Sequence, residues 1–243
     1  MPDLVTDDAR IEQARRWLRD ASSITVLTGA GISAESGVPT FRGPGGLWRQ
    51  YRPEDLATEA AFRRDPVLVW EWYAWRRGLL SKSNPNPGHA ALARLESRTS
   101  DFTLITQNVD GLHDRAGSRN VLKIHGDIWI NRCIRCGRET RSEDNAAPPP
   151  CDCGGSVRPG VVWFGEPLPS RVWDASERAS RRAGVFIVAG TSAQVYPAAG
   201  LVPLAKLSGA KVIEVNLEET PMSPVVDLSL RGPCGEVLPE IVG

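Results

Sequence analysis

The chain has 243 residues, and its 29 basic and 29 acidic side chains give a formal net charge of zero. A balanced charge creates no overall field for nucleic acid or an anionic membrane, so we expect neither as a partner. No apolar run reaches about 18 residues and residues 1–20 are charged throughout, which predicts no membrane span and no signal peptide. We therefore expect a cytoplasmic protein with a substantial core, in one large domain with a smaller insertion.

The first chemical motif follows an apolar run near the amino end. Residues 7–20 predict an amphipathic helix, and residues 24–27 are short and β-branched, which favours a buried strand. Residues 29–34 then read G-x-G-x-x-A, a turn that brings backbone close to a pyrophosphate at the start of a following helix. An acidic ribose ligand is expected about 20 positions on, but residues 39–46 form a Gly- and Pro-rich loop instead. This departure suggests a dinucleotide that is consumed rather than docked for hydride transfer.

Further apolar runs predict more strands, and polar residues follow each of them. The runs are residues 102–105, 121–124, 185–189 and 211–215. Residues 53–81, rich in Trp and interrupted at Pro66, have a helical pattern. Alternating strands and helices predict an α/β fold, with a Rossmann-like parallel sheet and helices on both faces. The polar residues would then meet at the carboxyl ends of the strands, where ligands bind in such sheets.

Four of the five cysteines have the spacing of a metal site. Cys133, Cys136, Cys151 and Cys153 read C-x2-C-x14-C-x-C. Each close pair can meet one tetrahedral zinc ion, and four thiolates leave no open position, so the zinc would be structural. Buried free thiols or two disulfides are the alternative. A zinc ribbon could also bind nucleic acid, but the segment lacks a continuous basic stripe with interleaved aromatic residues.

These patterns divide the chain into two expected domains. Residues 1–48, 90–128 and 157–243 are assigned to a Rossmann-like domain that binds the dinucleotide. Residues 49–89 form a helical module, and residues 129–156 form the zinc-binding module. The two modules are expected to make up the smaller domain together.

Three histidines could supply a general base, since only His has an unperturbed pKa near neutrality. They are His89, His113 and His125. His125 ends a predicted strand, and its position alone leaves a catalytic and a structural role equally open. A packed or capping role is the more common one for His89, which follows an N-P-N-P-G turn. We interpret His113, within the block TQNVDGLH, as structural.

A family resemblance runs along the chain. Residues 29–43, GAGISAESGVPTFRG, closely resemble the signature of the sirtuins, NAD-dependent protein lysine deacylases. It continues through TQNVDGLH at 106–113, HG at 125–126, the four cysteines, GTS at 190–192 and VNLE at 215–218. The resemblance implies NAD as co-substrate, one structural zinc, and acyl-lysine segments of substrate proteins as partners. We expect a monomer.

In the reaction that the resemblance implies, the acyl-lysine carbonyl oxygen attacks a ribose carbon of NAD and neutral nicotinamide leaves. A histidine then removes the proton of a ribose hydroxyl, which attacks the resulting imidate. Water finally releases free lysine and O-acyl-ADP-ribose. The matching positions assign catalysis to His125, Asn108 and Asp110.

The resemblance also implies which residues bind NAD and the peptide. The NAD-binding positions are Gly29, Ala30, Gly31, Ser33, Ala34, Glu35, Phe41, Arg42, Trp48, Gln107, Asn108, Val109, Asp110, Gly190, Thr191, Ser192, Asn216, Leu217, Glu218 and Cys234. At Cys234 the family's backbone contacts adenine, although a small buried hydrophobe is the alternative role of its side chain. VVWFGE, at residues 161–166, resembles the segment that pairs as a strand with the substrate. Its expected contacts are Val161, Val162, Trp163 and Phe164.

The segment VWEWYAWRRG, at residues 69–78, bears on the acyl group. Tyr73 and Arg76 are three positions apart on a predicted helix and share one face. A solvated face is the more common setting for such an Arg, and we expect Arg77 beside it to be a surface residue. An Arg among Trp side chains could instead bind a carboxylate through two hydrogen bonds, with the Tyr hydroxyl adding a third. The pair resembles the one that grips succinyl- and malonyl-lysine in class III sirtuins, and Ala57 matches the small residue of that pocket. The resemblance thus implies desuccinylation and demalonylation beside deacetylation.

Two other functions share some of these features. An ADP-ribosyltransferase would use the same ribosyl intermediate but transfer it to a protein. A catalytically silent NAD-sensing scaffold built on the zinc ribbon is the other possibility. The presence of His125, Asn108 and Asp110 argues against the scaffold.

Overall fold

The computed structural model describes residues 8–40, 52–141, 147–148 and 150–243. Six strands pair side by side in one sheet, in the order β3-β2-β1-β7-β8-β9, and every neighbouring pair is parallel. The strands are β1 (Ser23–Thr28), β2 (Asp101–Thr106), β3 (Val121–Lys123), β7 (Val185–Ala189), β8 (Lys211–Asn216) and β9 (Leu228–Arg231). The strand order reverses between β1 and β7, which is where an open α/β sheet forms a ligand crevice. The predicted Rossmann-like parallel sheet is confirmed.

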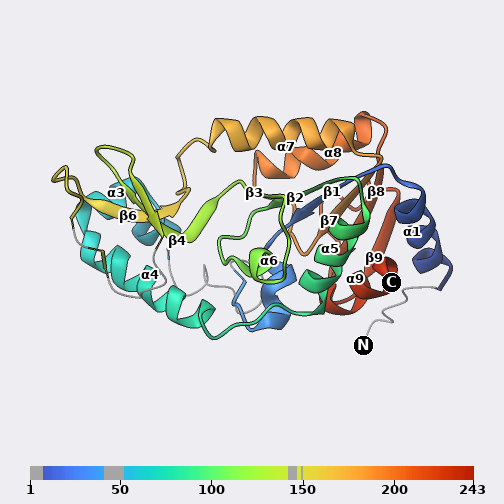
Figure 1. Ribbon diagram of the computed structural model, residues 1–243, viewed down its shortest axis with the longest axis horizontal. Coiled ribbons are helices and arrows are strands. Elements are labelled where there is room, and N and C mark those ends of the chain that lie inside the picture. Colours follow the sequence, from blue (N-terminus) through green and yellow to red (C-terminus); the bar gives the residue numbers. More distant parts are fainter. Residues whose placement is uncertain (1–7, 41–51, 142–146, 149) are drawn as a thin grey trace.

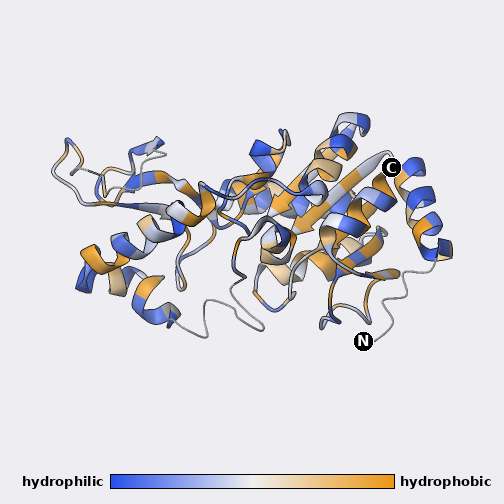
Figure 2. Cartoon of the chain, turned by 90° about the horizontal axis from the view of Figure 1, so that it is seen from below, coloured by the Kyte–Doolittle hydropathy of each residue, from blue (hydrophilic) through white to orange (hydrophobic). Residues whose placement is uncertain are grey.

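Helices cover both faces of this sheet. Successive strand residues point to opposite sides, so an apolar strand has apolar side chains on both faces, and both must be covered. Ile24 and Val26 of β1 face one core cluster, and Leu27 faces the other. Figure 1 shows α7 (Ser170–Arg182) and α8 (Leu201–Leu207) on one side of the sheet, with α5 (Pro87–Arg98) and α9 (Cys234–Val242) on the other. The first helix, α1 (Asp8–Asp20), joins the cluster of α5 and α9. The strands between these layers are mostly orange in Figure 2, as expected for strands buried on both faces.

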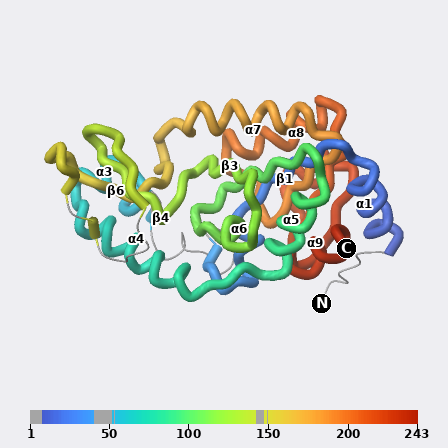
Figure 3. The backbone as a smooth tube through the Cα atoms, viewed as in Figure 1, coloured from blue at the N-terminus to red at the C-terminus, as the bar shows by residue number. Residues whose placement is uncertain are grey.

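A second, smaller unit lies at the other end of the molecule (Figure 1). Its antiparallel sheet has the order β5-β4-β6 and contains β4 (Gly126–Cys133), β5 (Glu139–Arg141) and β6 (Val157–Val161). Three helices pack against it: α2 (Pro53–Leu56), α3 (Glu59–Arg64) and α4 (Pro66–Leu80). Figure 3 shows the α4 and β6 segments side by side although they are far apart in sequence. The remaining short elements are η1 (Ala30–Ser36), α6 (Leu112–Arg115) and η3 (Ala198–Gly200).

The predicted interruption at Pro66 is confirmed as a helix start. Pro66 opens α4, where its missing N–H removes nothing because the first helical N–H groups have no partner within the helix. Asp65 precedes it as N-cap, and its Oδ1 accepts the Leu68 N–H at 2.9 Å. The Trp-rich face of α4 then packs into the small unit. Among the described residues no helix is long and apolar enough to span a membrane.

The helix expected after the glycine turn is present as a seven-residue 3-10 helix, η1. One expectation is wrong: Arg77, expected at the surface, is 0% exposed. Its Nε donates to the Ile128 carbonyl at 2.8 Å and its Nη2 donates to Asn131 Oδ1 at 2.7 Å. Arg77 therefore ties α4 to β4, and the hydrogen bonds offset the cost of burying its charge.

Candidate active site

The glycine turn meets the end of β7 at the point where the strand order reverses. The Gly31 N–H donates to the Gly190 carbonyl at 2.7 Å. A Cβ on Gly31 would lie 2.7 to 2.9 Å from backbone atoms of Gly190, closer than real Cβ contacts come. Gly190 itself has φ +60°, in the left-handed region that favours glycine. Glycine is therefore required at positions 31 and 190 because the turn after β1 packs directly against the end of β7, whatever role either glycine has toward a ligand.

A cavity of about 1160 Å³ extends from this crevice to the small unit. Its walls combine the carboxyl ends of β1, β2, β7 and β8 with α4 and the segment after β6. The sequence-predicted residues along it are Gly29, Ala30, Gly31, Ala34, Ala57, Tyr73, Arg76, Gln107, Asn108, Val109, His125, Val161, Val162, Trp163, Phe164, Gly190, Thr191, Ser192, Asn216, Leu217 and Glu218. Phe41, Arg42 and Trp48 lie outside the described residues.

Four predicted site residues stand behind the cavity wall formed by the described residues: Ser33, Glu35, Asp110 and Cys234. Ser33 Oγ donates to Asp110 Oδ2 at 2.8 Å, and Asn108 Nδ2 donates to Ser33 Oγ at 3.2 Å. Burial raises the pKa of Asp110. These two hydrogen bonds fix the orientation of the Asn108 side-chain amide, and Asn108 lines the cavity.

The other two of these residues meet at the start of α9. Glu35 Oε2 accepts the Gly235 N–H at 2.7 Å, so η1 is attached to the first turn of that helix. Cys234 is 4% exposed, and burial raises the pKa of its thiol to about 12. Its side chain is thus a small buried hydrophobe that stays protonated.

His125 is the histidine that lines the cavity. Its Nδ1 lies 3.0 Å from the Gln107 carbonyl oxygen, and because a carbonyl only accepts, Nδ1 carries the proton. The neutral ring then has its lone pair on Nε2. Burial lowers the pKa of His125, which keeps the ring neutral near physiological pH. These are the properties of a general base held in one tautomer.

The other two histidines have the packing roles expected for them. His89 is the N3 residue of a capping box at the start of α5: its backbone N–H and Nδ1 pair with Asn86. Burial lowers the pKa of His89 to about 4. His113 Nε2 lies 3.0 Å from Thr28 Oγ1, and burial holds its pKa well below the ordinary value. Both rings are therefore neutral at physiological pH.

Tyr73 and Arg76 line the small-unit end of the cavity. Arg76 is 7% exposed, which excludes a solvated helix face. Its guanidinium carbon lies 5.0 Å from the centre of the Trp72 ring and 5.9 Å from that of Tyr73. The Trp163 indole N–H donates to Tyr73 Oη at 2.9 Å. The Tyr hydroxyl is thereby oriented, and its own hydrogen can be donated to a group in the cavity.

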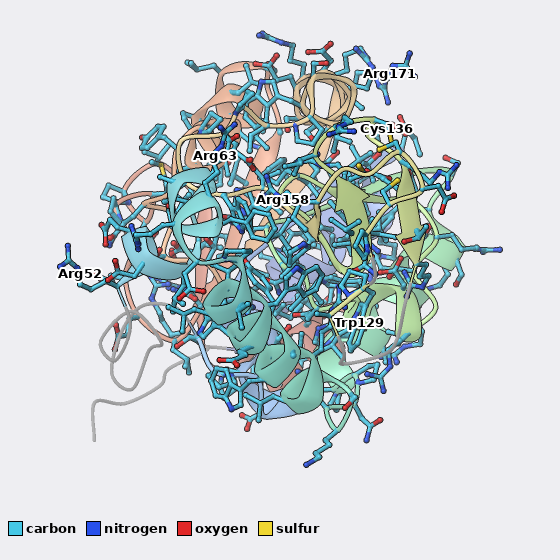
Figure 4. The ribbon with its side chains drawn as sticks, turned by 90° about the vertical axis from the view of Figure 1, so that its left-hand side faces the viewer. Arg52, Arg63, Trp129, Cys136, Arg158 and Arg171 are labelled. Atoms are coloured by element: carbon cyan, nitrogen blue, oxygen red, sulfur yellow. The ribbon has the colours of Figure 1, made fainter. Side chains whose placement is uncertain are left out.

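Residues 162–166, which follow β6, are held in place by hydrogen bonds to neighbouring side chains and backbone. Arg158 pairs with Glu166, and Glu166 Oε2 accepts the Trp163 N–H at 2.8 Å. In Figure 4, Arg158 lies near the middle of the view, whereas Arg171, on α7, lies at its upper edge. The Val162 N–H donates to the His125 carbonyl at 2.8 Å and the Phe164 N–H donates to the Ala57 carbonyl at 3.0 Å. Since these N–H groups are engaged, a peptide strand would have to pair here through carbonyl groups or beyond Phe164.

The four cysteine sulfurs converge at the end of β4. All four lie within 4.8 Å of one another, with Cys133 Sγ and Cys153 Sγ 3.5 Å apart and Cys136 Sγ and Cys151 Sγ 3.6 Å apart. In the described part of the chain no cysteine forms a disulfide. Two thiolates on a tetrahedral zinc are about 3.8 Å apart, so the donor set fits one zinc ion. Such an ion would cross-link the ends of the small sheet.

Removal of metal should therefore unfold the small sheet. A structural zinc contributes several kcal/mol and each kcal/mol moves Tm by about 2–4 °C in a chain of this size, so we expect Tm to fall by roughly 10 °C. Scanning calorimetry before and after chelation measures this shift, and a thiol-dye assay should find one zinc per chain. Cys136→Ser should lose the ion, whereas Cys234→Ser, the matched control outside the cluster, should retain it. Full zinc content in Cys136→Ser would contradict this assignment.

Some cavity residues had no motif to mark them. They include Trp72, Leu168, Trp173, Asp174, Gln194, Val195, Tyr196, Pro197, Glu219 and Thr220. Residues 194–197 come just after the GTS block that follows β7. The rule that ligand-facing residues follow a strand would have predicted them if it had been applied a few residues beyond that block. Trp173 and Asp174 come from α7, and their approach to the cavity depends on how that helix packs.

Fold and site together define an α/β protein with a crevice where the strand order reverses, a buried neutral histidine and a four-cysteine ribbon. Residues 29–197 match the model of the Sir2 family. The chain is 52% identical over 228 residues to NAD-dependent protein deacylase 2 of Pyrobaculum aerophilum, covering 93% of this chain and 92% of that protein. The chain therefore belongs to the Sir2 family, as the resemblance predicted.

Solved structures agree with this membership. A Sir2 homolog–NAD complex is 51% identical with a TM-score of 0.90, over 95% of this chain and 92% of the other. The structure of Sir2Af2 bound to a myristoylated histone peptide is 35% identical with a TM-score of 0.78, over 97% and 96% of the two chains.

Proposed function

We propose that this protein is an NAD-dependent protein lysine deacylase, which yields nicotinamide, O-acyl-ADP-ribose and free lysine. The observation that carries the proposal is one continuous cavity that joins the crevice at Gly31 and Gly190 to His125 and then to Arg76. A nucleotide at one end and an acyl-lysine at the other would meet beside the histidine. Family membership and the printed names of the relatives support the same activity.

The roles proposed for the residues follow from their hydrogen bonds. His125, with its proton on Nδ1, accepts the proton of a ribose hydroxyl at Nε2 as that oxygen attacks the imidate carbon. Asn108 orients the reacting sugar or the nicotinamide amide, and Ser33 and Asp110 hold Asn108 from behind. We assign Gln107 and Thr191, whose side chains bond at 3.0 Å, to the ribose and phosphate wall.

We propose succinyl and malonyl groups as substrates in addition to acetyl. A buried cation such as Arg76 is costly unless it meets an anion, and the cavity beside it could admit a carboxylate. Two guanidinium N–H groups and the Tyr73 hydroxyl would supply three hydrogen bonds. Ala57, a small residue at the same wall, leaves room for the longer acyl chain.

The domain limits expected from the sequence are kept in this proposal with one change. Because β6 pairs with β4 from Gly126 onward, the zinc-binding module is extended from residues 129–156 to residues 126–161. The acyl-lysine segment would lie between the two domains, along residues 161–164.

Mass spectrometry of acetyl-, succinyl- and malonyl-lysine peptides tests this function. Peptides incubated with the protein should lose the acyl mass only when NAD is present, with one nicotinamide and one O-acyl-ADP-ribose formed per lysine released. Deacylation without NAD would exclude the proposal. A gain of the ADP-ribose mass on a protein, without loss of acyl groups, would favour the ADP-ribosyltransferase. NAD binding with no nicotinamide release would favour the silent scaffold.

A further inference from the structure

A buried carboxylate in β8 gathers four hydrogen-bond donors. The side chain of Glu214 is 2% exposed. Its oxygens accept from Thr220 Oγ1 at 2.5 Å, Ser223 Oγ at 2.7 Å, Ser229 Oγ at 2.9 Å and Arg231 Nη1 at 2.7 Å. Although burial raises the pKa of Glu214, these donors hold it below its ordinary value. The group is therefore an anion enclosed by the protein.

The four donors belong to two different structures. Ser229 and Arg231 lie on β9, the neighbouring strand of the sheet. Thr220 and Ser223 lie in the loop of residues 217–227 that joins β8 to β9. Within that loop the Thr220 N–H donates to Ser223 Oγ at 2.8 Å. Glu214 thus ties the loop to the sheet at two points.

The first part of this loop forms one end of the cavity. Residues 216–220 all line it, whereas Glu214, Ser223 and Ser229 do not. Asn216 Nδ2 also donates to the Glu218 carbonyl at 3.0 Å, so the lining residues turn back on the strand end. The carboxylate therefore lies one layer behind a wall that a ligand would touch.

Glu214 stands among apolar residues along β8, and Arg231 of β9 is its charged partner in the sheet. The neighbouring buried residues of β8 are Val212, Ile213 and Val215, and all are apolar. Burying a carboxylate costs several kcal/mol unless its hydrogen bonds compensate, and an apolar residue would avoid that cost. What an apolar residue cannot do is hold two hydroxyl groups of a loop in fixed positions.

We propose that Glu214 is a positioning residue for NAD: it holds residues 216–220 in the shape that receives the nucleotide. The inference rests on the proposed function only in taking the cavity as the site of NAD. A loop that is already ordered loses less conformational entropy when a ligand binds. The affinity for NAD therefore depends on the hydrogen bonds of Glu214, although Glu214 itself does not line the cavity. The acyl-lysine end of the cavity, at Tyr73 and Arg76, should not respond to it.

Two serines offer a test, because each donates one hydrogen bond to the same oxygen of Glu214. Ser223 also accepts from the Thr220 N–H and from Arg231 Nη2, so it connects the loop to the sheet, whereas Ser229 lies on the strand. Ser223→Ala releases the loop, and Ser229→Ala removes a donor on the strand. We expect Ser223→Ala to raise the KM and the Kd for NAD about tenfold. Its kcat at saturating NAD and its KM for acyl peptide should stay unchanged. Ser229→Ala should leave all of these constants within about twofold of the unmutated protein. Glu214→Gln, which presents an amide donor to the same hydroxyls, should exceed the effect of Ser223→Ala.

The readouts separate this inference from the proposed function. Titration calorimetry with NAD measures Kd even in a protein with no turnover, so absence of deacylation would overturn the function and leave the positioning role to be decided by Kd. Equal Kd values for NAD in Ser223→Ala and the unmutated protein would overturn the positioning role. So would equal losses in the two serine variants, since that result would indicate general destabilisation. Calorimetric Tm values for both variants show whether they are comparably folded.

Discussion

Replacing His125 with Ala is expected to lower kcat for deacylation by about 10² to 10⁴-fold, the usual contribution of a general base. Nicotinamide release precedes the proton transfer assigned to this residue, so the variant should still form up to one equivalent of nicotinamide per chain and then stop. Rapid-quench measurement of nicotinamide and of free lysine separates the two steps. Substantial free lysine at the unmutated rate would contradict the assignment.

The pH profile gives a second check on His125. Its pKa is lowered by burial, so the neutral, proton-accepting ring persists at pH values below the ordinary histidine pKa of about 6.5. The rate should therefore fall on the acid side only below that pH, and this acid limb should be absent in His125→Ala. His113→Gln is the control, because that ring packs against Thr28 away from the cavity. It should change Tm and leave the acid limb in place.

The elements that follow local rules could be predicted from the sequence. Four strands of the large sheet, β1, β2, β7 and β8, are short apolar runs buried on both faces, and such runs are visible without any partner. β9 alternates Leu with Ser and Arg, and no strand was predicted there. The role of His89 was also visible, because a capping box uses residues three positions apart. The cysteine cluster was predictable for the same reason, since each close pair carries its own spacing.

The elements that depend on distant partners could not be predicted. Arg77 resembles a surface arginine until Asn131, 54 positions later, is brought against it. The hydrogen bonds of Glu214 also depend on distant residues. Thr220, Ser223 and Arg231 are common loop and strand residues, and the register of β8 with β9 brings them to one carboxylate. Ser33 and Asp110 were predicted as site residues, but that they act from behind Asn108 depends on how η1 packs.

The second large effect concerns the acyl group. Arg76→Met should lower kcat/KM for succinyl-lysine peptide by about 100-fold or more, because a buried guanidinium–carboxylate pair is worth several kcal/mol. Activity on acetyl peptide should stay within about threefold, since acetyl carries no charge for Arg76 to meet. Met fills a similar volume without a charge, so burial becomes less costly and Tm should not fall. Steady-state kinetics with both peptides measure the ratio.

Two variants show whether the effect belongs to the pocket. Tyr73→Phe removes one donor and should lower succinyl activity about 10-fold while sparing acetyl activity. Arg63→Met removes an arginine whose side chain is 73% exposed and paired with Glu59 at the surface, and neither activity should change. Equal loss of both activities in Arg76→Met would mean that the guanidinium supports the fold of α4 rather than the acyl carboxylate. A selective loss would mean that Arg76 is kept buried at this position because its charge binds the carboxylate of the substrate.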